Sequence, residues 1–149
     1  MRAIKYILGL MFLIGVLGCY IFTPNVPLGG NLELTSDYYH YVWLLNRATH
    51  KNKLALKRFL SIDKDAGAAE DHGAVIIELI KLQGDDFFSE TLKEIDSKRI
   101  QQLNSYIGSA TQFNRGSFND SLFKQHPKTF KALKYTSEEM REDSANTGY

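Results

Sequence analysis

The sequence has 149 residues, of which 23% are charged and 44% hydrophobic, and its formal net charge at pH 7 is +1. This near-neutral balance gives no electrostatic reason to expect nucleic-acid binding, which needs a clearly basic face. About 110 residues lie between the amino-terminal segment and a polar carboxyl terminus, which is enough for one hydrophobic core but not for two.

The amino-terminal residues have the pattern of a secretory signal. Arg2 and Lys5 precede an uncharged, mostly apolar stretch over residues 7–18, which ends at Cys19, the single cysteine of the sequence. A short basic segment, an apolar core and a small residue at its end are typical of signal peptides. One cysteine cannot form an internal disulfide, so we expect this residue to serve another purpose.

The stretch Val16-Leu17-Gly18-Cys19 resembles the lipobox of bacterial lipoproteins, although that family favours leucine where Val16 stands and a smaller residue where Leu17 stands. The resemblance implies that residues 1–18 are a cleaved signal peptide. It also implies that Cys19 is acylated, with palmitate as a typical chain, and becomes the mature amino terminus. The expected location is then the bacterial cell envelope, with the protein anchored to the membrane and facing the periplasm or the exterior.

Two other types of signal fit the same residues. The apolar run continues past Cys19 through Tyr20-Ile21-Phe22, so that residues 6–22 form a stretch of 17 residues. This length is close to the shortest that can span a hydrocarbon layer of about 30 Å. An uncleaved signal anchor over residues 1–22 is therefore an alternative, and an ordinary cleaved signal is another.

Residues 19–33 predict a flexible tether. Pro24, Pro27, Gly29 and Gly30 lie within it, and such residues disfavour a helix or a central strand. At the other end, residues 137–149 are polar and poor in large apolar side chains, which predicts a disordered tail. We therefore expect one folded domain over residues 34–136.

Apolar residues recur at helical spacing throughout that domain. Ser36 is a candidate cap for a first helix that carries Tyr38, Tyr41 and Leu45 on one stripe. Further helices are expected from Asn52, from about 66 to 82 with Gly84 as the stop, from Asp85 or Asp86, from Ser97 to Gly108, and, more weakly, over 118–123 and 130–133.

Strand patterns are sparse, because the sequence has neither a sustained alternating run nor an Asn-Gly or Asp-Gly turn. The sequence predicts an all-α fold, either a compact bundle or a short HEAT-like stack of about five to seven helices.

Patterns typical of catalytic or metal sites were not found. The sequence lacks His-Glu-x-x-His, Cys-x-x-Cys, Gly-x-Ser-x-Gly and a phosphate-binding glycine loop. Asp63 and Asp65 resemble the start of a calcium loop, but Gly67, Ala68 and Ala74 stand where a ligand, a glycine and a glutamate are required. The four histidines are dispersed: His40, His50, His72 and His126. We expect no metal and no cofactor.

One acid–base hypothesis concerns Glu70, Asp71 and His72, which are adjacent at the start of a predicted helix. Neighbouring residues on a helix point about 100° apart, so adjacency does not make them a catalytic pair. Acidic residues near a helix start are also favoured by the helix dipole alone. We therefore expect these residues to be structural.

Two groups of residues are candidates for an interaction surface. The aromatic residues are good interface anchors, but a small core also needs them. The basic residues can contact anionic lipid or an acidic partner, but they also fit a solvated helix face. The aromatic group is Tyr38, Tyr41 and Trp43, and the basic group is Lys53, Lys57 and Arg58.

The sequence thus predicts a membrane-anchored extracytoplasmic helical protein, attached by lipid or by an amino-terminal helix. Its expected role is that of a non-catalytic envelope accessory factor that binds an unidentified protein. A periplasmic immunity protein that neutralises a toxin is an alternative. An enzyme that uses Glu70 or Asp71 is a third reading.

Overall fold

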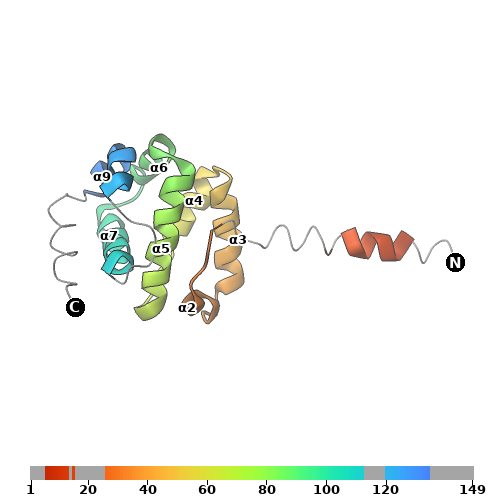
Figure 1. Ribbon diagram of the computed structural model, residues 1–149. Helices are drawn as coiled ribbons and strands as arrows, with labels where there is room; N and C mark the ends of the chain where they lie inside the picture. Colours follow the sequence, from red (N-terminus) through yellow and green to blue (C-terminus); the bar gives the residue numbers. More distant parts are fainter. Residues whose placement is uncertain (1–5, 14, 16–25, 113–119, 135–149) are drawn as a thin grey trace.

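A computed structural model describes residues 6–13, 15, 26–112 and 120–134 of the chain. These described residues form helices, turns and connecting segments and contain no β-strand. The predicted all-α fold is therefore confirmed, and the helices pack into a compact bundle (Figure 1).

The bundle contains the following helices in chain order: α2 (Gly30–Glu33), α3 (Tyr38–Thr49), α4 (Lys53–Leu60), α5 (Ala66–Gln83), α6 (Asp85–Leu92), α7 (Ser97–Gln112), α8 (Asp120–Gln125) and α9 (Pro127–Leu133). Residues 6–13 form a separate helical segment whose side chains are exposed. No helix among the described residues has both the length and the apolar character needed to cross a membrane.

Helix α5 is the centre of the bundle and packs against α2, α3, α6 and α7 (Figure 1). Its central position follows from an apolar surface that is broad enough to face several neighbours, since Val75, Ile76, Ile77, Leu79 and Ile80 are all fully buried. The helix ends at the predicted stop, Gly84, which has the positive φ of 81° that glycine adopts readily.

Helices α3 and α4 pack against each other as a helical hairpin, and α3 also contacts α5 (Figure 1). The turn between them ends at Asn52, whose side-chain oxygen accepts a hydrogen bond of 2.9 Å from the N–H of Ala55. This bond confirms the predicted start of α4 at Asn52 and satisfies one of the first-turn N–H groups that lack a partner within the helix. The inner faces of the two helices meet through the rings of Tyr41 and Phe59, whose centroids are 4.8 Å apart.

The expected tether differs from the structure in its second half. Val26 and Leu32 are buried, and the main-chain N–H of Asn31 donates a hydrogen bond of 3.0 Å to the carboxylate of Asp71 on α5. Residues 26–33 therefore belong to the folded body, and the short helix α2 lies against α5 (Figure 1). This position could not be predicted from the local sequence, because the anchoring carboxylate lies 40 positions further along the chain.

Two expected helix ends also shift. Helix α3 begins at Tyr38 with Asp37, not Ser36, at its cap position. Helix α7 begins at the predicted Ser97, but the carboxylate that accepts a first-turn hydrogen bond, from the N–H of Arg99, belongs to Asp96. The same helix passes through Gly108 and ends at Gln112, because Ala110 still packs in the core beyond the glycine.

Candidate functional site

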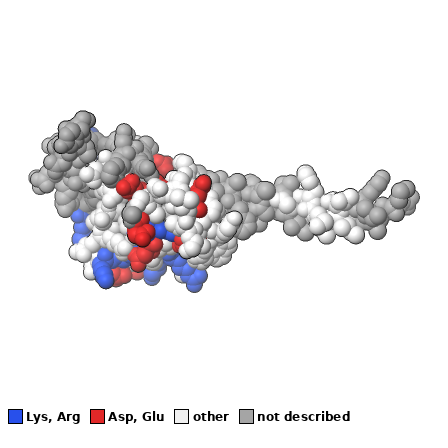
Figure 2. All heavy atoms as spheres, turned by 90° about the horizontal axis from the view of Figure 1, so that it is seen from below, with Lys and Arg blue, Asp and Glu red and all other residues white. Residues whose placement is uncertain are grey.

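The hairpin of α3 and α4 has an unusual charge. Residues 38–62 contain five lysines and arginines and no aspartate or glutamate, whereas the whole chain has a net charge of only +1. The acidic residues therefore lie elsewhere in the sequence. Figure 2 shows one face on which acidic atoms gather toward the middle and basic atoms lie mainly along the lower and left margins. Charges of opposite sign are thus partly separated on the surface.

A groove of about 520 Å³ lies between the outer sides of α3 and α4, and we call it the α3–α4 groove. Its lining combines aliphatic side chains, which range from buried to exposed, with basic, imidazole and hydroxyl groups. The described residues that line it are His40, Leu44, Leu54, Lys57, Arg58, Ser61 and Ile62. Leu54 is 59% exposed, which is high for a leucine on a helix that buries its other apolar residues.

The predicted basic residues Lys53, Lys57 and Arg58 are all on α4, and the last two line the groove. Glu94, just beyond α6, contacts both lysines: its carboxylate lies 2.7 Å from the Lys53 ammonium and 3.5 Å from that of Lys57. The hydrogen bond from Lys53 holds the pKa of Glu94 below its ordinary value. Because these ion pairs are exposed, they restrain the lysines only weakly.

The predicted aromatic residues divide between surface and core. Trp43 is half-buried on the outer side of α3, where its ring stacks on His40 at 5.9 Å and lies under the guanidinium of Arg47 at 5.0 Å. Tyr38 is half-buried and meets the exposed ring of Tyr39 edge-on at 5.7 Å. Trp43 therefore extends the surface beside the α3–α4 groove.

Tyr41 does not belong to an interaction surface, because only 1% of it is exposed. Its hydroxyl forms a buried hydrogen bond of 2.8 Å with Nδ1 of His72. Burial raises the pKa of Tyr41 well above its ordinary value of 10. The expectation that Tyr41 contributes to binding is therefore corrected: it is a core residue, as its place on the apolar stripe of α3 also allowed.

The hypothetical acid–base group on α5 is built into the core. His72 is fully buried among the rings of Tyr41, Phe59 and Tyr106, at centroid distances of 5.1–5.5 Å. Burial, reinforced by the charges of Arg99 and Lys64, lowers the pKa of His72 to about 3. Its imidazole is therefore neutral at physiological pH.

The two carboxylates beside His72 differ in burial. Asp71 is 2% exposed and accepts the hydrogen bond from Asn31 that holds α2. Glu70 is half-buried on the same helix. Among the described residues, no group of three or more histidine, cysteine, aspartate and glutamate side chains could hold a metal ion.

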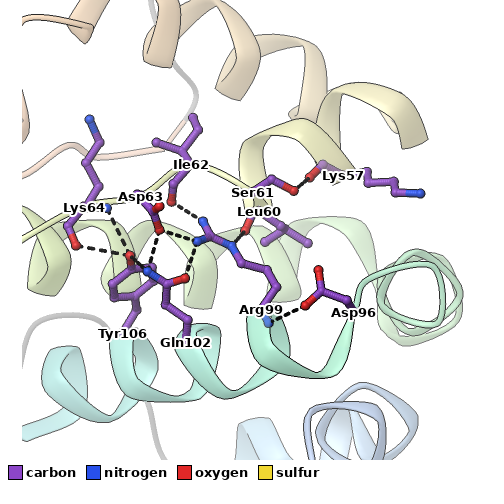
Figure 3. Close-up of polar contacts among 10 residues, drawn as sticks. All are labelled: Lys57, Leu60, Ser61, Ile62, Asp63, Lys64, Asp96, Arg99, Gln102 and Tyr106. Carbon is purple, nitrogen blue, oxygen red and sulfur yellow. Dashed lines mark hydrogen bonds and ion pairs between the residues drawn. The ribbon is translucent and has the colours of Figure 1, made fainter.

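A buried arginine that the sequence reasoning missed fixes one end of the groove. Arg99 points from α7 to the end of α4 (Figure 3), where its Nε donates to the carbonyl of Leu60 at 2.6 Å and its Nη2 donates to the carbonyl of Ile62. Its Nη1 lies 2.6 Å from Oδ1 of Asp63. Since Ile62 lines the groove, Arg99 holds a part of the groove wall in place.

The same network continues along α7 (Figure 3). Gln102 donates to Asp63 at 2.5 Å and to the hydroxyl of Tyr106 at 2.7 Å, and that hydroxyl in turn bonds the main chain of Lys64. Hydrogen bonds from Arg99 and Gln102 lower the pKa of Asp63. One sign was present in the sequence: Arg99 lies four and seven positions before Leu103 and Tyr106, so it places a cation on a buried helical stripe.

The segment Asp63-Lys64-Asp65, which resembles the start of a calcium loop, borders a polar hollow of about 620 Å³ between the α2–α3 turn and α7. Two of its three carboxylates are paired with cations. The ammonium of Lys64, whose side chain is 4% exposed, lies 2.6 Å from Asp37, while Asp63 is bound by Arg99. The hydrogen bond from Lys64 lowers the pKa of Asp37. This hollow is best explained as the surface of a structural network.

The predicted lipidation site, Cys19, and the predicted tail over 137–149 lie outside the described residues. Comparisons with protein-family models, with curated protein sequences and with solved structures found no match to this chain. The α3–α4 groove is therefore the candidate site on structural grounds alone.

Proposed function

We propose that this chain is a membrane-anchored protein of the bacterial envelope, attached through Cys19 as a lipoprotein, whose helical domain binds another protein without catalysing a reaction. The observation that carries the binding role is the α3–α4 groove, with the exposed Leu54 and a basic rim. The lipobox-like residues before Cys19 support the anchor.

The groove suits binding because its walls are already fixed. Helices α3 and α4 share buried ring contacts, and Arg99 holds the segment that carries Ile62. A preformed site loses little conformational entropy when a partner docks. The lining offers apolar, basic and hydroxyl groups for contact with a partner.

Site-specific photo-crosslinking in living bacterial cells tests the binding role. We place p-benzoylphenylalanine at Leu54 or Ser61 in the groove and, as controls, at Leu82 or Lys131, which are exposed on α5 and α9. We expect a discrete adduct of higher mass from the groove positions and not from the controls. Absence of any adduct from the groove positions, in a membrane fraction that contains the protein, would contradict the proposal.

Fatty-acid labelling tests the anchor. Cys19→Ala should abolish incorporation of a clickable fatty acid and leave an unprocessed precursor. Equal membrane retention of the variant, together with no labelling of the parent protein, would instead identify an uncleaved signal anchor. If the crosslinked partner is a toxin that enters the periplasm, the accessory role becomes that of an immunity protein.

A further inference from the structure

We infer, on the basis of the function proposed above, that the partner presents an acidic amphipathic α-helix to the α3–α4 groove. The charge of the hairpin is the first reason. Five cations and no acidic residue lie between residues 38 and 62, and Glu94 is the carboxylate that pairs with two of these cations. Arg58 is exposed at the groove and presents its charge to a partner.

The second reason is the distribution of apolar groups within the groove. Leu54 lies in the first turn of α4, Ile62 lies just beyond its last turn, and Leu44 forms part of the floor. Helix α4 has 8 residues, which corresponds to a length of about 12 Å. A partner helix of two to three turns, with apolar residues at positions i, i+3 or i+4, and i+7, matches a strip of this length.

The shape of the groove fits an acidic helix better than the surface of an anionic lipid bilayer. Leu44 is only 2% exposed and Ile62 is half-buried, so these side chains lie within the hollow instead of protruding from it. A flat lipid surface would reach the basic rim and Leu54 but not the floor. A helix side chain can enter the hollow while acidic residues on its flanks face Lys57 and Arg58.

Binding of synthetic peptides to the full chain in mild detergent tests the inference. The probe is an acetylated and amidated peptide of about 14 residues, roughly 21 Å as a helix, with leucines on one face and glutamates elsewhere. One control peptide has lysine at every glutamate position, and another has the same composition in an order that destroys the helical period. Fluorescence anisotropy measures each dissociation constant.

We expect the acidic peptide to bind at least about tenfold more tightly than either control peptide, because only it combines the matching charge with an apolar stripe. Leu54→Ser and Arg58→Glu should each weaken this binding by about tenfold. Leu82→Ser and Lys131→Glu change an exposed leucine and an exposed lysine away from the groove and should leave it unaltered. Higher salt should weaken the binding.

Equal binding of the scrambled peptide, or equal effects of the groove and control variants, would overturn the inference. It would also be overturned if phosphatidylglycerol vesicles, but not the acidic peptide, bound the domain and lost affinity on Arg58→Glu. An adduct from groove positions in cells without binding of the acidic peptide would leave the proposed function intact and reject only this partner chemistry. No adduct from those positions would reject the proposed function itself.

Discussion

Asp85, the first residue of α6, caps the start of α9: its Oδ1 accepts a hydrogen bond of 2.7 Å from the main-chain N–H of Thr129. Its Oδ2 accepts a second bond of 3.0 Å from the N–H of Lys128. These two N–H groups lie in the first turn of α9, where a helix has no partners of its own for them. A residue 44 positions earlier thus does what a neighbouring cap residue does in most helices.

Asp85→Ala should lower the free energy of unfolding by about 1–2 kcal/mol, because it removes the cap of α9. The matched control is Asp86→Ala in the same turn, because the carboxylate of Asp86 lies 2.5 Å from the exposed ammonium of Lys128. That change should cost about 0–0.5 kcal/mol. Urea unfolding followed by the fluorescence of Trp43, the single tryptophan, measures both, and equal losses would contradict the capping role.

Gly73→Ala should be strongly destabilising. A Cβ atom at residue 73 would lie 1.9 Å from the carbonyl oxygen of Tyr106, so α5 and α7 would have to move apart. We expect a loss of about 1–3 kcal/mol, as for overpacking in a core. Gly67→Ala on the same helix is the control, since its Cβ would meet the movable side-chain amide of Asn31. The same urea midpoint for both variants would show that the close approach carries no cost.

Arg99→Lys should lower the free energy of unfolding by about 2–3 kcal/mol. A lysine keeps the charge, but it cannot donate from three nitrogens to the carbonyls of Leu60 and Ile62 and to Asp63. Amide hydrogen exchange at Lys64 should also accelerate, since its N–H bonds the hydroxyl of Tyr106 in this network. Arg58→Lys on the exposed side of α4 is the control and should change neither quantity. If the urea midpoint and the exchange rate were unaltered in Arg99→Lys, this would contradict the role of Arg99 in holding the end of α4 in place.

Stability should fall as the pH decreases from about 6.5 toward 4.5. His72 has a folded-state pKa of about 3, below its ordinary value of 6.5, so in this range the unfolded chain binds a proton that the folded chain does not. The part of the free energy of unfolding that depends on neutral His72 is fully present above pH 6.5. It is lost progressively as the pH falls toward 3, with a slope of up to about 1.4 kcal/mol per pH unit. His72→Gln should remove this slope. Below pH 4, protonation of Asp37, Asp63 and Asp85, whose pKa values are lowered, should destabilise both proteins.

The helices could be predicted because their information is local. The stripe of Ile76, Leu79 and Ile80, the cap at Asn52 and the stop at Gly84 all act within a few residues of their own helix. The contacts that were missed connect distant positions. Helix α2 is held by Asp71, and Arg99 binds main-chain carbonyls nearly 40 positions away, which carry no side-chain pattern at all.

The candidate site could be predicted only in part, for the same reason. The surplus of cations on α4 was visible in the sequence, and the structure adds that Lys57 and Arg58 border a groove. The groove itself depends on the angle between α3 and α4 and on where Ile62 is held, neither of which has a local signal. Tyr41 was predicted at the interaction surface because it is aromatic, but in the structure it is buried and bonds His72.

The bond between Asn31 and Asp71 has a mechanical consequence. A pull on the amino-terminal end of the chain would enter the folded body at residues 26–32 and load the packing of Val26 and the bond from Asn31 to α5. Tension would thus reach the central helix before it reaches α3. With the amino-terminal anchor proposed above, a pull on that anchor would load α5 while the α3–α4 hairpin keeps its shape.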